Sequence, residues 1–243
     1  MKLAVFDIDG TLTKTVSVDA DCYVRAFADT HGISGINTNW AEYAHATDSA
    51  ITLQVFKERL GRAPDADELL RLKQCFVSLL KERYMANSAL FAELPGASTA
   101  LLRLGQESGW AIAIAAGSWC ESARLKLEAV GIELEGLPAA FADDGVSREE
   151  IVQGAISKAL ALHQQASFEK VVSIGDALWD VHTARRLNLA FLGVGSGEYA
   201  AVLRRAGVCH IVEDFRDYDC FLRYLNDARV PKSRITSATK SAT

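Results

Sequence analysis

The sequence predicts an α/β protein: a doubly wound, Rossmann-like parallel sheet with an all-helical segment inserted after the first strand. Short apolar runs alternate with helical patterns over residues 94–230, which is typical of strands joined by crossover helices. Residues 14–93 have helical spacing and no strand pattern. We therefore expect an α/β core of residues 1–13 and 94–230, a helical insertion of residues 14–93, and a mobile tail of residues 231–243.

The first strand is expected at Leu3–Phe6, because a continuous apolar run fits the inside of a parallel sheet. Helical spacing then predicts three helices in the insertion: Val16–His31, Ser49–Leu60 and Asp65–Phe91. Gly32 and Gly61 follow the first two helices, as expected at helix C-termini. The insertion should therefore form a small helical bundle.

Strands and helices alternate again from Pro95 onward. The strands expected there are Trp110–Ala115, Ala139–Phe141, Val171–Ile174, Phe191–Val194 and His210–Val212. The helices expected between them are Ala97–Ser108, Cys120–Val130, Arg148–His163 and Asp180–Leu187. The tail from Pro231 is rich in Ser, Thr, Lys and Ala and lacks apolar anchors, so we expect it to be mobile.

Composition narrows the class of protein. A net charge of −5 argues against a nucleic-acid partner, since phosphate contact needs a basic face. No apolar stretch approaches the roughly 20 residues that span a bilayer, and only four apolar residues separate Lys2 from Asp7, so we expect neither a membrane segment nor a signal peptide. The five cysteines show no CxxC spacing, which favours reduced, buried cysteines in a cytoplasmic protein.

Acidic residues follow two of the expected strands. Asp7 and Asp9 come directly after the first strand, and Asp176 and Asp180 follow Val171–Ile174. Ligands of open α/β sheets bind where the strands end. Two carboxylates about 4 Å apart repel by about 4 kcal/mol at an effective dielectric constant near 20. Such a pair needs a cation or a shared proton, and either is chemically useful.

These segments carry two motifs in a fixed order: DxDxT as Asp7-Ile8-Asp9-Gly10-Thr11, and GDxxxD at Gly175–Asp180. Together they resemble the haloacid dehalogenase superfamily, most members of which are Mg²⁺-dependent phosphatases and phosphomutases. The similarity is to the branch of phosphoglycolate phosphatases and β-phosphoglucomutases, and it covers the whole core. The place of the insertion matches the helical cap of that branch.

The resemblance implies a role for each motif residue. Asp7 would be the nucleophile that becomes an aspartyl-phosphate, and Asp9 would serve as general acid and then general base. Mg²⁺ would be held by the Asp7 carboxylate, the Asp9 backbone carbonyl and the Asp176 carboxylate, with Asp180 binding a metal water or orienting its neighbours. Thr11 would support the loop through hydrogen bonds. The alternative role of Asp176 and Asp180 is to cap the N-terminus of a helix. The alternative for Thr11 is a capping role only.

Two positions depart from the pattern of the superfamily. Ala116 stands where a phosphate-binding Ser or Thr is usual, but Ser118 and the amide of Gly117 can bind a phosphate oxygen before the next helix. A lysine is missing from the third motif, and Arg148 can supply its charge. The alternatives are that Ser118 caps the next helix and that Arg148 is a solvated surface residue.

The loop between the first two helices of the insertion should meet the non-phosphate part of a substrate. His45, Thr47 and Asp48 are the candidates, since related enzymes lower a loop here over the core. Thr47, Asp48 and Ser49 equally form a cap for the helix that begins near Ala50. The sequence leaves both readings open.

The resulting hypothesis is a Mg²⁺-dependent phosphomonoester hydrolase that acts on a small phosphorylated metabolite, as a monomer or homodimer. Asp9 favours phosphoryl transfer, because carbon–halogen hydrolases of the superfamily lack this second aspartate. One alternative is a sugar phosphomutase with the same motifs. Another is a catalytically weak binding or regulatory protein, suggested by Ala116 and the missing lysine.

Overall fold

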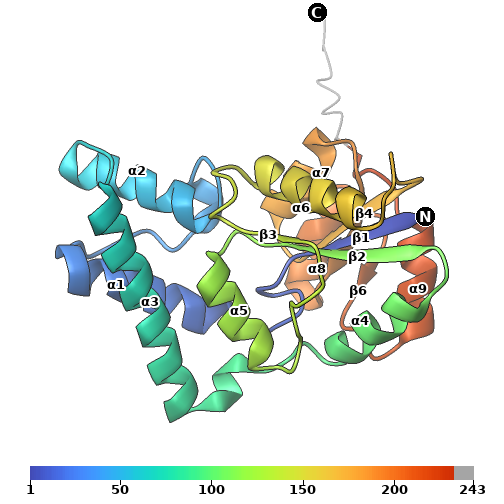
Figure 1. Ribbon diagram of the computed structural model, residues 1–243, viewed down its shortest axis with the longest axis horizontal. Coiled ribbons are helices and arrows are strands. Elements are labelled where there is room, and N and C mark those ends of the chain that lie inside the picture. Colours follow the sequence, from blue (N-terminus) through green and yellow to red (C-terminus); the bar gives the residue numbers. More distant parts are fainter. Residues whose placement is uncertain (233–243) are drawn as a thin grey trace, which may run out of the picture.

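A computed structural model describes residues 1–232 (Figure 1). This part of the chain contains one parallel sheet in the order β3-β2-β1-β4-β5-β6. Its strands are β1 (Lys2–Phe6), β2 (Trp110–Ala115), β3 (Ala139–Ala140), β4 (Val171–Gly175), β5 (Ala190–Val194) and β6 (Ile211–Val212). The order reverses direction between β1 and β4, which is where doubly wound sheets bind ligands. The predicted fold class is confirmed.

Helices cover both faces of the sheet. Figure 1 shows α6 and α7 on one side of it and α4, α5 and α9 on the other. The helices of the core are α4 (Ala97–Gln106), α5 (Cys120–Glu128), α6 (Arg148–Leu162), α7 (Leu178–Arg186), α8 (Gly197–Arg205) and α9 (Tyr218–Asp227). Successive side chains of β1 point to opposite faces of the sheet. Phe6 belongs to the same buried cluster as Phe221 of α9, and Val5 belongs to a second cluster with Ile151 of α6. Burying each such side chain contributes about 1.5–3 kcal/mol.

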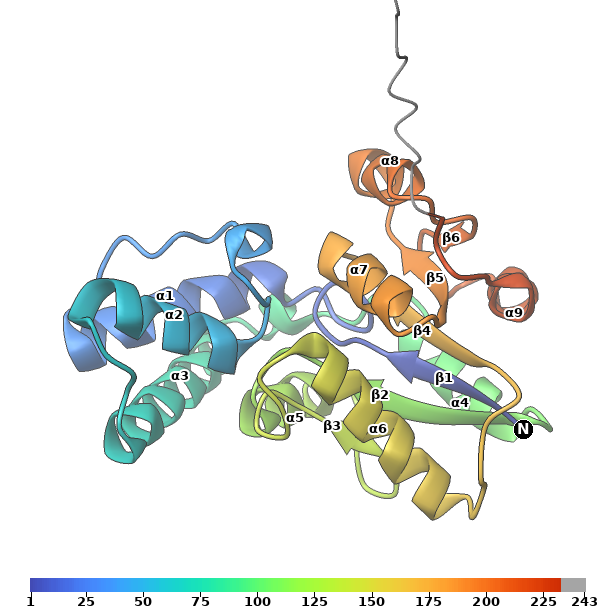
Figure 2. The same cartoon turned by 90° about the horizontal axis from the view of Figure 1, so that it is seen from above.

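The helical insertion, residues 14–93, lies beside the edge of the sheet at which β1 ends (Figure 2). Its elements are α1 (Val16–His31), the 3₁₀ turn η1 (Trp40–Glu42), α2 (Asp48–Leu60), α3 (Ala66–Ala86) and the 3₁₀ turn η2 (Ser88–Phe91). The chain leaves and re-enters the core side by side, since Lys14 N donates to Ala92 O at 2.8 Å and Leu94 N to Leu12 O at 2.9 Å. The domain boundaries themselves stay a prediction.

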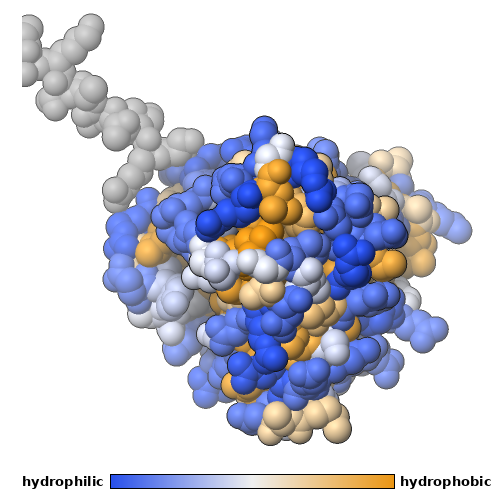
Figure 3. All heavy atoms as spheres, turned by 90° about the vertical axis from the view of Figure 1, so that its left-hand side faces the viewer, coloured by the Kyte–Doolittle hydropathy of each residue, from blue (hydrophilic) through white to orange (hydrophobic). Residues whose placement is uncertain are grey.

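Aromatic side chains join the insertion to the core. The buried ring of Trp119, which precedes α5, lies 5.8 Å from Tyr23 of α1 and 6.1 Å from Phe76 of α3. The outer face of the insertion, turned to the viewer in Figure 3, is largely hydrophilic with apolar residues between. The apolar sides of α1 and α3 therefore face each other and the core.

The structure corrects two expectations about helices. The helix predicted to run to Phe91 ends at Ala86, because Asn87 takes an extended conformation and its side chain accepts a hydrogen bond from Ala89 N. Helices α8 and α9 were not predicted. The buried residues Tyr218, Phe221 and Leu225 of α9 have helical spacing, so that helix could have been found.

Three remaining expectations concern the whole chain. The predicted mobile tail, 231–243, lies outside the described residues except for Pro231 and Lys232. All five cysteines carry free thiols, as expected, but only Cys22 is buried and Cys209 is exposed, so the prediction that they are buried is wrong for four of them. Among residues 1–232, no helix combines the length and the apolar character that crossing a membrane requires.

Candidate active site

The ends of three neighbouring strands meet at one edge of the sheet. Because β1 lies between β2 and β4, the segments after these strands bring Asp7, Ser118 and Asp176 to one place. Carboxylate oxygens of Asp7, Asp176 and Asp180 lie within 4.8 Å of one another. Their negative charges are thus concentrated where the sequence predicted a metal site.

Glycines allow this crowding. A Cβ on Gly10, whose φ is +82°, would lie 2.1 Å from Asp176 Oδ2, and a Cβ on Gly175 would lie 2.6 Å from Asp180 Oδ2. No side chain fits at either position without moving a carboxylate. The glycines of the two motifs therefore let the two acidic loops approach each other.

Arg148 lies inside the site rather than on the surface. It is the first residue of α6, whose N-terminus is fixed by a capping box of Ser147 and Glu150. Its Nη1 donates to Asp7 Oδ1 at 3.0 Å and to Asp180 Oδ1 at 2.9 Å. Burial raises the pKa of Asp7 to about 7, an effect that the positive charge of Arg148 opposes. Arg148 thus occupies one oxygen of Asp7 and leaves the other free.

The donor set fits a hard divalent cation. Burial, together with the charges of Asp180 and Asp7, raises the pKa of Asp176 well above its usual value. Arg148 supplies one positive charge to the three clustered carboxylates, and carboxylate oxygens are the ligands that Mg²⁺ prefers. Both oxygens of Asp180 already have partners, since Oδ1 accepts from Arg148 and Oδ2 from Ala177 N at 3.2 Å. Asp180 therefore fits the role of orienting its neighbours, and it also caps α7.

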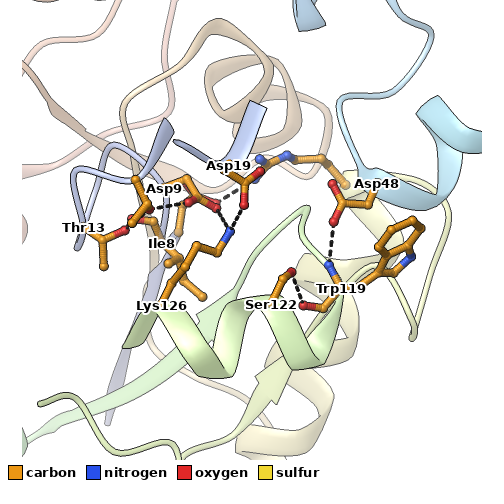
Figure 4. A network of polar contacts seen from close by, with 11 residues as sticks. Ile8, Asp9, Thr13, Asp19, Asp48, Trp119, Ser122 and Lys126 are labelled. Carbon is orange, nitrogen blue, oxygen red and sulfur yellow. Dashed lines mark hydrogen bonds and ion pairs between the residues drawn. The ribbon is translucent and has the colours of Figure 1, made fainter. Parts of the chain in front are cut away.

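The side chain of Asp9 points toward a buried lysine (Figure 4). Lys126 of α5 has no exposed surface, and its Nζ lies 2.6 Å from both Asp9 Oδ2 and Asp19 Oδ1 of α1. The Thr15 hydroxyl donates to the other oxygen of Asp9. Burial raises the pKa of Asp19 to about 6. One lysine thus links the core, through Asp9, to the insertion, through Asp19.

Lys126 was missed in the sequence, although a signal was present. It lies beside Leu127 and three residues after Ala123, both fully buried residues of α5. A lysine on the apolar side of a helix is almost never fully buried unless it is paired. Its position therefore indicated acidic partners elsewhere in the chain.

The hydroxyl of Ser118 is buried and has no hydrogen-bond partner among residues 1–232. It does not cap α5, whose N-cap is Trp119. Gly117 lies against the insertion, since a Cβ there would meet Ala46 O at 2.6 Å. An unpartnered buried hydroxyl beside a cluster of charges is suited to bind a phosphate oxygen.

Thr11 differs from expectation. It is fully buried, and within the described residues its hydroxyl has no hydrogen-bond partner, so it does not support the loop through its side chain. Thr13 and Thr15 do so instead: the Thr13 hydroxyl donates to Ile8 O at 3.3 Å and is bonded to that of Thr15. The hydroxyl groups that support the loop are thus those of Thr13 and Thr15, two and four residues after the predicted Thr11.

The insertion loop caps α2 and also contacts the core; its contact with a substrate stays a prediction. Thr47 caps α2 by accepting from Ala50 N at 3.1 Å. Asp48 instead reaches the core, where its Oδ2 accepts from Trp119 N at 2.8 Å (Figure 4). His45 makes neither contact. Its Nδ1 lies 4.0 Å from Glu149 Oε2, and the residue lines a neighbouring cavity.

A cavity of about 320 Å³ opens between the insertion and the core. On the core side it is lined by Asp9, Ser118, Arg148 and Asp176. On the side of the insertion, Asp48 and Thr47 line it. Gly117 also lines this cavity, and Asp7 and Asp180 lie beside it, bonded to Arg148. Thr11 and His45 are not among its lining residues.

Comparison with known proteins shows the family and the fold of this chain. A family model described as haloacid dehalogenase-like hydrolase matches residues 1–188, so the chain belongs to that hydrolase family. A hydrolase from Pseudomonas syringae is similar in structure, with a TM-score of 0.70, 22% identity and coverage of 93% of this chain and 99% of its own. No curated protein matches the chain.

Two further solved structures share the fold. A candidate β-phosphoglucomutase from Bacteroides vulgatus has a TM-score of 0.65 and 17% identity, over 93% of this chain and 89% of its own. A predicted phosphoglycolate phosphatase from Haemophilus somnus has a TM-score of 0.55 and 16% identity, over 91% of this chain and 98% of its own. The similarity to the superfamily found in the sequence is confirmed.

Proposed function

We propose that the protein is a Mg²⁺-dependent phosphomonoester hydrolase that acts on a small phosphorylated metabolite through an aspartyl-phosphate on Asp7. The observation that carries this proposal is the meeting of Asp7, Asp176 and Arg148 with the unpartnered hydroxyl of Ser118 beside one cavity. Family membership supports a hydrolase. Residues 14–93 would act as a cap over this site.

In the first step the free oxygen of Asp7 attacks phosphorus, and the bond from phosphorus to the leaving oxygen breaks. Arg148 holds the other oxygen of Asp7 and keeps the carboxylate oriented. The Ser118 hydroxyl donates a hydrogen bond to a phosphate oxygen. Asp9, as general acid, transfers its proton to the leaving oxygen. Mg²⁺, held by Asp7, Asp176 and the Asp9 carbonyl, would supply charge neutralisation when bound.

In the second step Asp9 takes a proton from a water molecule that attacks phosphorus. The bond between phosphorus and the Asp7 oxygen breaks, which releases phosphate and restores the carboxylate. The contacts from Lys126 and Thr15 fix the position of the Asp9 carboxylate, and Asp9 is one of the residues that line the cavity. Closure of the insertion over the site would exclude other water until the leaving group departs.

Removal of divalent metal should abolish turnover reversibly. We expect phosphate release from p-nitrophenyl phosphate to fall by about 100-fold or more in EDTA, because the charge on the phosphoryl group is then uncompensated. Excess Mg²⁺ should restore the rate, and circular dichroism before and after chelation controls for unfolding. Full activity in excess EDTA would contradict the proposed metal dependence.

A sugar phosphomutase would use the same motifs but return the phosphoryl group to the sugar. Incubation with glucose 1-phosphate, followed by assays of both isomerised sugar and free phosphate, separates the two reactions. The proposal predicts that any turnover yields free phosphate. Isomer without phosphate release would establish a mutase, and binding of phosphate esters without any turnover would favour a catalytically weak binding protein.

A further inference from the structure

The cavity beside the phosphate site has aromatic walls. Tyr23 and Trp40 line it from the insertion, with ring centroids 6.0 Å apart and planes at 88°, and Trp179 and Tyr199 line it from the core. The face of an aromatic ring attracts a cation, most strongly when the pair is shielded from water. A positively charged group is therefore favoured in this space.

Asp48 adds a carboxylate to the same space. It is only 8% exposed, and its Oδ1 has no hydrogen-bond partner among residues 1–232, whereas Oδ2 accepts from Trp119 N. Burial and the nearby charge of Asp19 raise the pKa of Asp48 well above its usual value. A buried carboxylate without a bonded cation is costly unless a ligand supplies the charge.

The basic side chains near the cavity are already bonded to carboxylates. Arg148 is the one basic side chain lining the cavity within residues 1–232, and it donates to Asp7, Asp180 and Ala46 O. Lys126 is held between Asp9 and Asp19. A leaving group with a carboxylate would thus meet an excess of negative charge and no free basic side chain here.

Six carboxyl groups surround the site, those of Asp7, Asp9, Asp19, Asp48, Asp176 and Asp180. With the proton that Asp9 carries as general acid, five negative charges still face the two cations Arg148 and Lys126. The charges of Mg²⁺ and of a phosphate dianion cancel, so neither changes this excess. We infer that the substrate is the phosphomonoester of an amino alcohol, whose ammonium group lies between Asp48 and the aromatic rings. This inference rests on the proposed function. Hydrolysis breaks only the phosphorus–oxygen bond and leaves the ammonium group unchanged.

Two esters of matched size test the inference. O-phosphoethanolamine and 2-phosphoglycolate each carry a two-carbon chain and differ in the sign of the terminal charge. We expect kcat/KM to be about 100-fold higher for O-phosphoethanolamine, because the cavity attracts one charge and repels the other. Equal values, or a preference for 2-phosphoglycolate, would overturn the inference.

A binding measurement separates failure of this inference from failure of the proposed function. Release of phosphate from p-nitrophenyl phosphate tests hydrolysis alone, so inactivity toward all three esters would reject the proposed function. Calorimetric titration of Asp7→Asn protein with the two charged esters in Mg²⁺ still compares their affinities. Tighter binding of O-phosphoethanolamine supports the inference, and equal or weaker binding rejects it.

The Asp48→Asn variant tests whether the negative charge of Asp48 favours the ester that carries an ammonium group. The amide oxygen can still accept from Trp119 N, so the shape is kept while the negative charge is lost. The ratio of the two kcat/KM values should fall by about 10-fold, whereas a purely structural role would change both values alike. Asp21→Asn is the control, since Asp21 lies exposed on α1 and should leave the ratio unchanged. A ratio unaffected by Asp48→Asn would count against the inference.

Discussion

Replacing Asp7 with Asn should lower the rate of phosphate release by about 1,000-fold or more, since an amide is not a nucleophile toward phosphorus. The substitution keeps the size of the side chain and an oxygen that can accept from Arg148. The site should therefore lose its chemistry and keep its shape. Steady-state release from p-nitrophenyl phosphate at saturating Mg²⁺ measures the effect.

Asp21→Asn provides the control for this substitution, because it makes the same chemical change at an exposed position of α1. Its rate should match that of the wild-type protein. Circular dichroism of both variants checks that each is folded. Unchanged turnover in Asp7→Asn would show that another group attacks phosphorus.

Lys126→Met should reduce the free energy of unfolding by about 3–5 kcal/mol, the loss typical of breaking a buried ion pair by removing one partner. Lys126 is fully buried and lies 2.6 Å from Asp9 and Asp19. Without it, both carboxylates lose their bonded cation. Urea unfolding at neutral pH, followed by circular dichroism, measures the difference.

A surface lysine provides the comparison for Lys126. Lys158 pairs with Asp144 at 2.8 Å, but its side chain is half exposed, so Lys158→Met should cost about 0–1 kcal/mol. Adding Asp19→Asn to Lys126→Met should recover part of the loss, because one unpaired charge is then removed. Equal losses for Lys126→Met and Lys158→Met would contradict the role given to the buried lysine.

The residues that follow the strands were predictable because parallel strands end at a common edge. Asp7 and Asp176 needed only the strand assignments and the sheet order, and β1, β2 and β4 were found from their apolar runs. Arg148 opens α6 with a capping box that is readable locally. The apolar runs therefore placed the acidic residues at one edge, and the resemblance to the superfamily implied the roles of Asp7, Asp176 and Arg148.

The rest of the site depends on contacts that local patterns do not encode. Lys126 meets partners 107 and 117 residues away, and Asp48 reaches Trp119 across 71 residues. The capping pattern at Thr47 is real, yet it says nothing about where the next carboxylate points. The burial of the Ser118 hydroxyl likewise depends on how the insertion packs against the core.

The most direct test of the account is to locate the transferred phosphoryl group. Asp9→Asn protein should form the aspartyl-phosphate from ³²P-labelled p-nitrophenyl phosphate, because p-nitrophenolate leaves without a proton, but should hydrolyse it slowly. After an acid quench and peptide mapping, we expect alkali-labile label on Asp7. Label on another residue, or turnover of this variant with no labelled protein, would contradict it.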